Sequence, residues 1–237
     1  MNKENYFGVS VSSYDYEGII DDIRHRMVEG ENSTIIAVNP EKVMAAEKNP
    51  DLMELINSAT YQIPDGIGII LASKLKKGSI RSRVTGVDMM DRLLKFAADE
   101  GHRVFMYGAK PEVVNQAAEN IQKKYPAITI AGTQHGYEQD QRKVVAKINE
   151  SKADILFVAM GSPRQELWIR EHMDGLHAKV FQGVGGSFDV FAGHVQRAPK
   201  VYRDMGLEWF YRLMKEPQRF KRQMALPKFL AKVLFSK

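Results

Sequence analysis

Short apolar runs alternate along this chain with longer segments in which apolar residues recur every three or four positions. The short runs are typical of buried β-strands and cover residues 33–39 (STIIAVN), 102–108 (HRVFMYG), 127–132 (AITIAG), 153–161 (ADILFVAMG) and 178–186 (AKVFQGVGG). The longer segments are typical of amphipathic helices and cover residues 86–101, 111–125 and 140–151. Strands that alternate with helices predict an α/β fold, with a mostly parallel sheet and helices on both of its faces.

Glycine and polar residues follow several of these predicted strands. Ligands of open parallel sheets bind beyond the carboxyl ends of the strands, a rule that selects Asn39 and the segments 108–110, 161–165 and 185–189. Each glycine there, taken alone, is more often a tight turn. Several glycine turns on one rim favour a site where a phosphate approaches backbone amides. No G-x-G-x-x-G fingerprint or P-loop is present, so a dinucleotide or ATP site has weak support.

A carboxylate stands in a Pro64-Asp65-Gly66 sequence ahead of another apolar stretch. Pro-Asp-Gly is turn chemistry, because proline presets φ, aspartate bonds its own backbone and glycine accepts a positive φ. Asp65 is equally suited to be the N-cap of a helix through Ile67, Ile70, Leu71 and Leu75. The residues alone therefore explain Asp65 without any catalytic role.

The positive charge is concentrated in the last 26 residues. The whole chain has a net charge of +5, whereas residues 212–237 hold eight basic side chains and one acidic side chain, a net charge of +7. Apolar residues lie between these charges, which favours an anionic membrane surface or a polyanionic ligand over a merely solvated helix. Nucleic acid is not expected as a partner, because no recognised nucleic-acid module accompanies the basic stretch. A compositional break near residues 196–216 predicts a core over 1–195 and an appendage over 196–237, and Pro217 suits the first turn of a helix there.

Several classes of chemistry find no support in the composition. The chain has no cysteine, so it has no disulfides and no thiol nucleophile, and its N-terminus lacks the apolar core of a signal peptide. The six histidines form no H-x-x-x-H pair and no Asp-x-Asp is present, so neither a metal nor a cofactor is expected. Turn carboxylates, glycine-lined strand ends and many arginines suit displacement of a diphosphate leaving group, with cationic side chains in place of a metal.

Seven motifs occur in the order found in one known family: VNPEKV (38–43), IPDGIGI (63–69), RVTGVDM (83–89), VFMYGAKP (104–111), GSPRQELWI (161–169), GVGGSFDVFAG (183–193) and RAPKVYRDMGLEWFYRLMKEPQRFKR (197–222). From about residue 5 to its end, the chain resembles the WecG/TagA/CpsF glycosyltransferases. The resemblance implies a Rossmann-like core and a helical, basic C-terminal appendage that completes the site at the membrane. It also implies transfer of N-acetylmannosamine from its UDP conjugate to N-acetylglucosaminyl-diphospho-undecaprenol in wall teichoic acid synthesis. The resemblance further implies a β-1,4 linkage formed with inversion and without an essential metal, by a cytoplasmic enzyme bound to the inner face of the cell membrane.

The resemblance also assigns roles to individual residues. Asp65 is the catalytic base that takes the proton of the acceptor hydroxyl. Arg212, Arg219 and Arg222 match the arginines of the family's appendage and are expected to meet the diphosphate. The chemistry of the side chains adds Arg83, suited to a phosphate or to orienting the acceptor, and Asn39 and Gln165, whose amides suit sugar hydroxyls, as substrate-binding residues. The position of the strand ends predicts Gly108, Gly185, Gly186 and Asp189 as nucleotide-binding residues. Some relatives carry a hydroxyl residue where this chain has Ala37, which puts one substrate contact in doubt.

Three questions stay open at this point. Related enzymes on the same scaffold use UDP-N-acetylmannosaminuronate or UDP-glucose as donors, so the donor sugar is the weakest inference. A nucleotide-dependent oxidoreductase and a non-catalytic peripheral membrane scaffold are the alternatives from other functional classes. The sequence does not determine the oligomeric state, and a homo-oligomer is one of the options.

Overall fold

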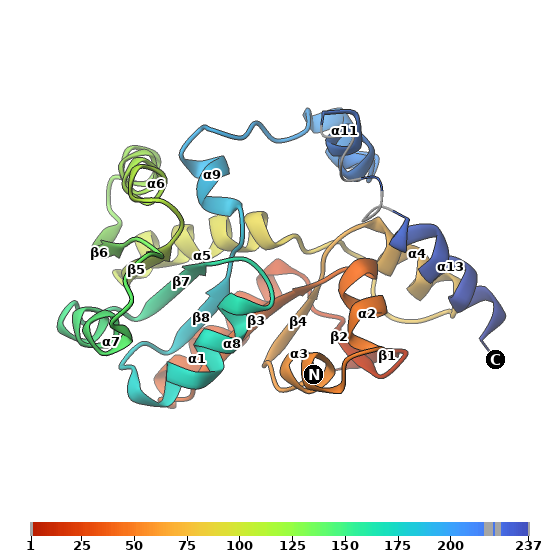
Figure 1. Cartoon of the computed structure of the whole chain (residues 1–237), viewed down its shortest axis with the longest axis horizontal. Coiled ribbons are helices and arrows are strands. Elements are labelled where there is room, and N and C mark those ends of the chain that lie inside the picture. Colours follow the sequence, from red (N-terminus) through yellow and green to blue (C-terminus); the bar gives the residue numbers. More distant parts are fainter. Residues whose placement is uncertain (1, 216–219, 221–223, 237) are drawn as a thin grey trace. The chain divides into compact units, whose positions relative to one another are not determined.

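The computed structural model (Figure 1) describes residues 2–215, 220 and 224–236, apart from the side chains of residues 204 and 212. Its main element is a six-stranded sheet of order β4-β3-β8-β7-β5-β6, and a separate two-stranded sheet pairs β1 with β2. The strands are β1 (Lys3–Tyr6), β2 (Val9–Ser12), β3 (Ser33–Val38), β4 (Tyr61–Pro64), β5 (Arg103–Gly108), β6 (Thr129–Gln134), β7 (Ile155–Ala159) and β8 (Val180–Gly183).

Helices connect these strands. They are α1 (Tyr16–Val28), α2 (Pro40–Ala46), α3 (Pro50–Asn57), α4 (Ile67–Leu75), α5 (Gly86–Glu100), α6 (Pro111–Lys124), α7 (Gln141–Glu150), α8 (Arg164–His172), the 3₁₀ turn η1 (Met173–Gly175), α9 (Ser187–Phe191), α10 (Lys200–Asp204), α11 (Glu208–Lys215) and α13 (Ala225–Phe235). All five predicted strands and all three predicted helices are present, with bounds shifted by one to three residues at most ends. The α/β prediction is therefore confirmed.

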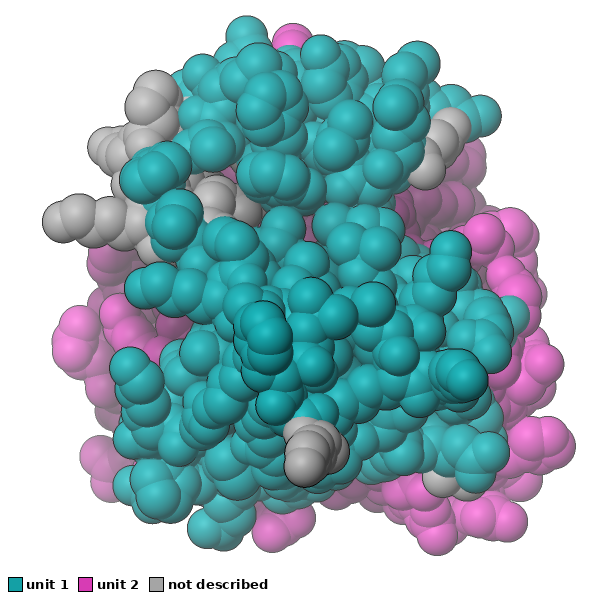
Figure 2. All heavy atoms as spheres, turned by 90° about the vertical axis from the view of Figure 1, so that its right-hand side faces the viewer, with its two compact units in different colours: residues 1–15, 37–85, 197–237 teal, residues 16–36, 86–196 magenta. Residues whose placement is uncertain are grey.

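The chain forms two compact units, which Figure 2 shows in different colours. Unit 1 combines residues 1–15, 37–85 and 197–237, and unit 2 combines residues 16–36 and 86–196. The division of the chain into a core over 1–195 and an appendage over 196–237 stays a prediction.

The core of unit 2 lies on both faces of its strands. β5 pairs in parallel with β6 and β7, and β7 pairs in parallel with β8. Alternate residues such as Phe105 and Tyr107 pack with Val144 of α7 and Trp168 of α8. Because side chains alternate across a strand, the residues between them point to the opposite face, and these are buried as well. Burial on both faces explains why β5 and β7 appear in the sequence as continuous apolar runs.

Unit 1 has a core of its own, built from segments far apart in the sequence. Helix α13 packs against α2 and α4, and Phe229 on α13 is fully buried. The Phe229 ring lies 5.8 Å from the ring of Tyr6 and 5.9 Å from that of Phe7. The basic C-terminal segment thus supplies part of the hydrophobic core of unit 1.

Strand β4 in unit 1 was not predicted by the hydrophobic pattern, because its sequence YQIP contains a glutamine and a proline. Gln62 is nevertheless fully buried. Its Nε2 donates hydrogen bonds to the carbonyl oxygens of Ile56 and Ala59, at 2.9 and 2.7 Å. A buried amide is tolerated where its polar atoms find such partners. No helix within the described ranges is long and apolar enough to cross a bilayer.

Candidate active site

Three of the predicted site residues lie at one edge of unit 1. Strand β3 ends at Val38 and β4 ends at Pro64, so Asn39 and Asp65 are the first residues after each strand. The Asp65 N–H donates a hydrogen bond to the Val38 carbonyl oxygen at 2.8 Å, and Val84 N–H donates to the Pro64 carbonyl oxygen at 3.0 Å. These two backbone bonds place Asn39, Asp65 and Arg83 on adjacent segments.

Asp65 is half-buried and precedes α4 by two residues. The helix predicted through Ile67 and Leu75 is confirmed, but its N-cap is Gly66, with φ 97° and ψ 152°, and not Asp65. A φ in this range favours glycine because it lacks a Cβ atom. The N-cap interpretation of Asp65 is therefore wrong, and the turn interpretation remains.

Asn39 is the N-cap of the next helix, α2. Its side-chain Oδ1 accepts a hydrogen bond from the Lys42 N–H at 2.9 Å, and Pro40 occupies the first turn of α2. This capping bond fixes the orientation of the Asn39 amide at the edge of the sheet.

Arg83 belongs to a partly buried cluster of charged side chains. Its Nη2 donates a hydrogen bond to Oε2 of Glu208 at 3.3 Å, and Nη2 of Arg197 lies 3.8 Å from the same oxygen. The Arg83 and Arg197 side chains are each 18% exposed, and that of Glu208 is 9% exposed. Arg197 and Glu208 were missed as site candidates, although both lie in the motif over residues 197–222. Nothing in the linear pattern marks Glu208 among the other acidic residues.

A cavity of about 570 Å³ lies in unit 2, at the carboxyl ends of β5 and β7. Two backbone bonds tie its edge together: Ala109 N–H to the Ala159 carbonyl oxygen at 2.8 Å, and Gly136 N–H to the Ala109 carbonyl oxygen at 3.0 Å. Its charged lining comes from Lys110, Glu112, Arg164 and Asp189, and its aromatic lining from Tyr137 and His194. The rule that ligands bind beyond the carboxyl ends of parallel strands, here called the strand-end rule, thus selected the edge at which this cavity is found.

The predicted glycines Gly108, Gly185 and Gly186 do not themselves line this cavity, and they have different backbone conformations. Gly108 has φ +114°, and a Cβ atom there would lie 2.3 Å from the Ala159 carbonyl oxygen, so the turn itself requires glycine. Gly185 also has a positive φ, of +51°. Gly186 is different, because φ is −78° and the nearest protein atom to an added Cβ is Oδ2 of Asp189 at 3.8 Å. A side chain could therefore be accommodated at Gly186, whereas at Gly108 it would collide with the backbone of Ala159.

Gln165 is buried and holds the loop after β8. Its Oε1 accepts a hydrogen bond from the Gly185 N–H at 2.9 Å, and its Nε2 donates to Oε1 of Glu166 at 3.3 Å. The amide oxygen of Gln165 therefore orients the glycine turn of residues 185–186.

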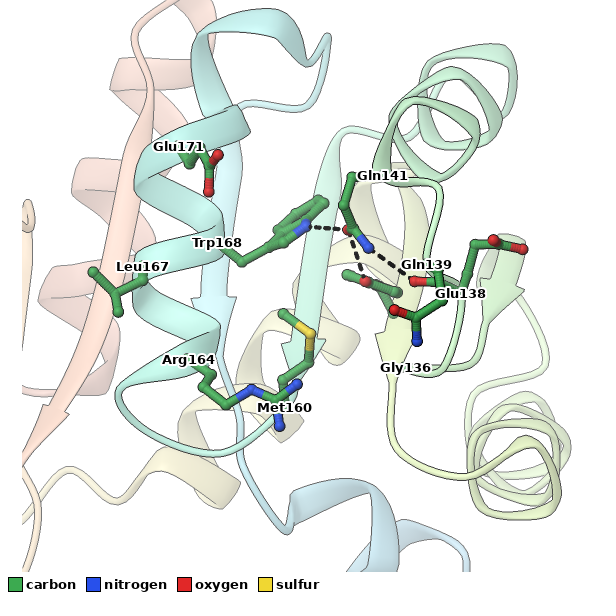
Figure 3. Close-up of a pocket in the computed structure, with 10 residues that line it drawn as sticks. Gly136, Glu138, Gln139, Gln141, Met160, Arg164, Leu167, Trp168 and Glu171 are labelled. Atoms are coloured by element: carbon green, nitrogen blue, oxygen red, sulfur yellow. Dashed lines mark hydrogen bonds between the residues drawn. The ribbon is translucent and has the colours of Figure 1, made fainter.

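A second cavity, of about 280 Å³, lies beside α8 in unit 2 (Figure 3). Gln141 lines this cavity, and its Oε1 accepts hydrogen bonds from Trp168 Nε1 at 2.8 Å and from the Tyr107 hydroxyl at 3.2 Å. Burial raises the pKa of the Tyr107 phenol. Arg164 and Met160 line both cavities.

The remaining predicted residues cannot be placed in the site. Arg219 and Arg222 lie outside the described residues, as does Pro217, and of Arg212 only the backbone in α11 is described. Within the described part of the chain, no group of three or more histidine, aspartate and glutamate side chains is arranged to hold a metal ion.

Comparison with known proteins gives a match over almost the whole chain. The model of the glycosyl transferase WecG/TagA/CpsF family matches residues 4–237. An N-acetylglucosaminyldiphosphoundecaprenol N-acetyl-beta-D-mannosaminyltransferase of Bacillus subtilis is 37% identical over 235 residues, which are 99% of this chain and 92% of the relative. A protein of the same name from Bacillus spizizenii is 40% identical over 206 residues, which are 87% of this chain and 80% of the relative. The chain belongs to the glycosyl transferase WecG/TagA/CpsF family.

Proposed function

We propose that this protein transfers N-acetylmannosamine from UDP-N-acetylmannosamine to N-acetylglucosaminyl-diphospho-undecaprenol, with formation of a β-1,4 linkage. The observation that carries the proposal is the 37% identity over 99% of the chain to a relative named for this transfer. Similarity of this extent covers both compact units and every predicted site residue, including those in the C-terminal segment.

The reaction is a displacement at the anomeric carbon of the donor. The acceptor hydroxyl oxygen forms a bond to that carbon, the bond from the carbon to the diphosphate oxygen breaks, and UDP leaves with the electron pair. The carboxylate of Asp65 takes the proton of the attacking hydroxyl. The Asp65 N–H is bonded to the Val38 carbonyl oxygen and the next residue is the N-cap Gly66, so the backbone that carries the carboxylate is held in place before substrate binds.

The donor nucleotide binds in unit 2, in the cavity at the ends of β5 and β7. Lys110 and Arg164 supply positive charge for a diphosphate, and the space around Gly186 allows a ligand to approach the backbone closely. The ring of Tyr137, which is 59% exposed, offers a face on which a nucleobase stacks. Asp189 lies at the same cavity as an acceptor for hydroxyl or base N–H groups.

The acceptor lipid binds through unit 1 and the basic C-terminal segment. Asn39 offers its amide to sugar hydroxyls, and Arg83 precedes Val84, whose N–H is bonded to the carbonyl oxygen of Pro64, next to Asp65. Arg212, Arg219 and Arg222 are proposed to meet the lipid diphosphate. The net charge of +7 over residues 212–237 attracts anionic lipid, by about 1 kcal/mol for each basic residue near the surface. The protein thereby binds peripherally to the inner face of the cell membrane.

The test is an assay of the purified protein with a short-chain lipid-diphosphate-GlcNAc acceptor and three donors. UDP-N-acetylmannosamine is expected to give a disaccharide product and UDP, whereas UDP-N-acetylmannosaminuronate and UDP-glucose are expected to give neither. Product from another donor alone would assign the protein to a different surface-polysaccharide pathway. Absence of transfer with all three donors, together with retained vesicle binding, would favour a peripheral scaffold.

A further inference from the structure

A glutamate of helix α11 forms the closest described charged contact of the predicted substrate residue Arg83. Nη2 of Arg83 is within hydrogen-bond distance of the Glu208 carboxylate, at 3.3 Å, and Arg197 is an ion-pair partner of the same oxygen at 3.8 Å. The three side chains are between 9% and 18% exposed. Solvent screens such a cluster less than an ion pair on the surface, so the carboxylate constrains where the Arg83 guanidinium lies.

The position of Glu208 is itself fixed against the segment that follows Asp65. Gly206 has φ +71°, and a Cβ atom there would lie 2.9 Å from Cδ1 and 3.0 Å from Cγ1 of Ile67. The turn between α10 and α11 therefore packs directly on the first residue of α4, two positions after Asp65. Helices α10 and α11 also contact each other, because the ring centroids of Tyr202 and Tyr211 are 5.4 Å apart.

Glu208 is also suited to its place in the helix. It is the first residue of α11, where a carboxylate is favoured by the positive end of the helix dipole. A substitution by glutamine removes this charge and leaves Arg83 and Arg197 close together without the anion between them. Two guanidinium groups then repel each other, and the arginines are expected to move apart into other rotamers.

We infer that Glu208 is a positioning residue, which holds the Arg83 guanidinium beside the Asp65 segment so that it can meet the anionic acceptor. The expected effect on kinetics rests on the proposed function, whereas the placement of Arg83 by Glu208 does not. It gives the segment from Arg197 to Lys215 a role in acceptor recognition that is distinct from attraction to the membrane.

The kinetic experiment compares Glu208→Gln, Arg83→Gln and the double variant, with a water-soluble acceptor so that membrane binding plays no part. Glu208→Gln is expected to lower kcat/KM for the acceptor about tenfold, the size of one lost hydrogen bond to a charged group, and to leave the KM for the donor unchanged. The double variant is expected to be no worse than Arg83→Gln alone, because Glu208 acts through Arg83. Losses that multiply in the double variant would overturn the inference.

A second measurement does not depend on catalysis. The Nη–Hη signals of Arg83 come from the group that donates to Glu208 and are assigned by their loss in Arg83→Gln. They are expected at a dispersed position in the NMR spectrum of the wild type and close to the free-arginine position in that of Glu208→Gln. An unchanged signal would overturn the inference even if transfer is lost. A collapsed signal in a protein that transfers no sugar would sustain the positioning of Arg83 and refute the proposed function.

Two further variants serve as controls for misfolding of Glu208→Gln and for an unspecific effect of removing a carboxylate. Glu208→Asp keeps the charge and shortens its reach by one methylene, so it is expected to give a smaller shift of the same signal even where Glu208→Gln does not fold. Glu17→Gln removes an exposed carboxylate from the pair with Arg92 in unit 2 and is expected to change neither the kinetics nor the Arg83 signal. A loss of acceptor kcat/KM as large in Glu17→Gln would mean that the effect is not specific to Glu208.

Discussion

Asp65 is proposed to act by taking one proton from the acceptor hydroxyl. Asp65→Asn keeps the shape of the side chain and the backbone bond to Val38, but an amide cannot take the proton of the acceptor hydroxyl. The rate constant kcat is expected to fall by about 10²-fold or more, with an unchanged thermal midpoint. Steady-state kinetics and a melting curve test both statements. Turnover near that of the wild type would remove Asp65 from the mechanism.

Gly186 allows a clean test of where the nucleotide binds. Its φ of −78° suits any residue, and an added Cβ would make only ordinary contact with Asp189. Gly186→Val is therefore expected to fold normally and to weaken UDP binding in calorimetry, because the branched side chain occupies space meant for the ligand.

The matched control for Gly186→Val is Gly175→Val, at a position of unit 2 with no protein atom within 4 Å of an added Cβ. It is expected to bind UDP as the wild type does. Gly108 is a poor probe, because substitution there collides with the backbone of Ala159. Equal affinity of Gly186→Val and the wild type would place the nucleotide elsewhere.

Glu4 gives unit 1 a stability that depends on pH. Its carboxylate accepts hydrogen bonds from the N–H groups of Ser79 and Ile80 and from the hydroxyl of Ser73. Burial raises the pKa of Glu4, but these bonds and that from Tyr6 together lower it below its ordinary value of 4.5. Because the folded pKa is the lower one, the contribution is present above about pH 4.5 and is lost as the pH falls through the folded pKa.

The corresponding experiment is chemical denaturation of Glu4→Gln and the wild type at several pH values. Glu4→Gln is expected to be less stable at pH 7, and the difference in unfolding free energy is expected to shrink as the solution is acidified below pH 4.5. A difference that stays constant with pH would show that the charge of Glu4 is not the stabilising feature.

At the scale of elements, α13 has one face in the core of unit 1 and another in solvent. Phe229 is fully buried, whereas Phe235 on the same helix is 87% exposed. Phe229→Ala is expected to destabilise the protein by about 3–5 kcal/mol, the cost of emptying a buried aromatic site. Phe235→Ala is expected to change the stability by less than about 0.5 kcal/mol, but to weaken binding to vesicles that contain anionic lipid.

This pair of variants separates packing from membrane attachment. Denaturant midpoints measure the first effect and vesicle sedimentation measures the second. Vesicle binding of Phe235→Ala equal to that of the wild type would argue that the exposed end of α13 does not enter the bilayer surface. An equal midpoint for Phe229→Ala would contradict the packing of α13 on the core.

For the whole molecule, the proposed chemistry requires cations at a diphosphate and uses side chains to supply them. Saturating EDTA is expected to leave most of the transfer activity in place, because arginine and lysine stabilise the charge of the leaving group. The assay is repeated with added Mg²⁺ or Mn²⁺, and neither is expected to raise the rate. Activity that disappears with EDTA and returns with either ion would reveal a metal requirement.

Local features of this chain could be predicted because their causes are local. A strand such as β7 is a continuous apolar run since both of its faces are buried, and α5 or α6 has apolar residues at helical spacing because only one side faces the core. Asn39 before Pro40 likewise predicts a helix start from neighbouring residues alone. The strand-end rule then located the edge with Gly108 and Asp189, because it depends only on strand direction.

Other features depended on contacts between distant parts of the chain. Glu208 meets Arg83 across 125 residues, Gln165 orients Gly185 through one amide oxygen, and α13 packs Phe229 against Tyr6. No periodicity records such pairs, because each side chain alone fits an exposed position as well as a buried one. The sequence thus determined which segments form strands and helices and which strand ends carry the candidate chemistry. The folded chain decided which side chains hold that chemistry in place, because burial and pairing are properties of the packed molecule and not of the segment.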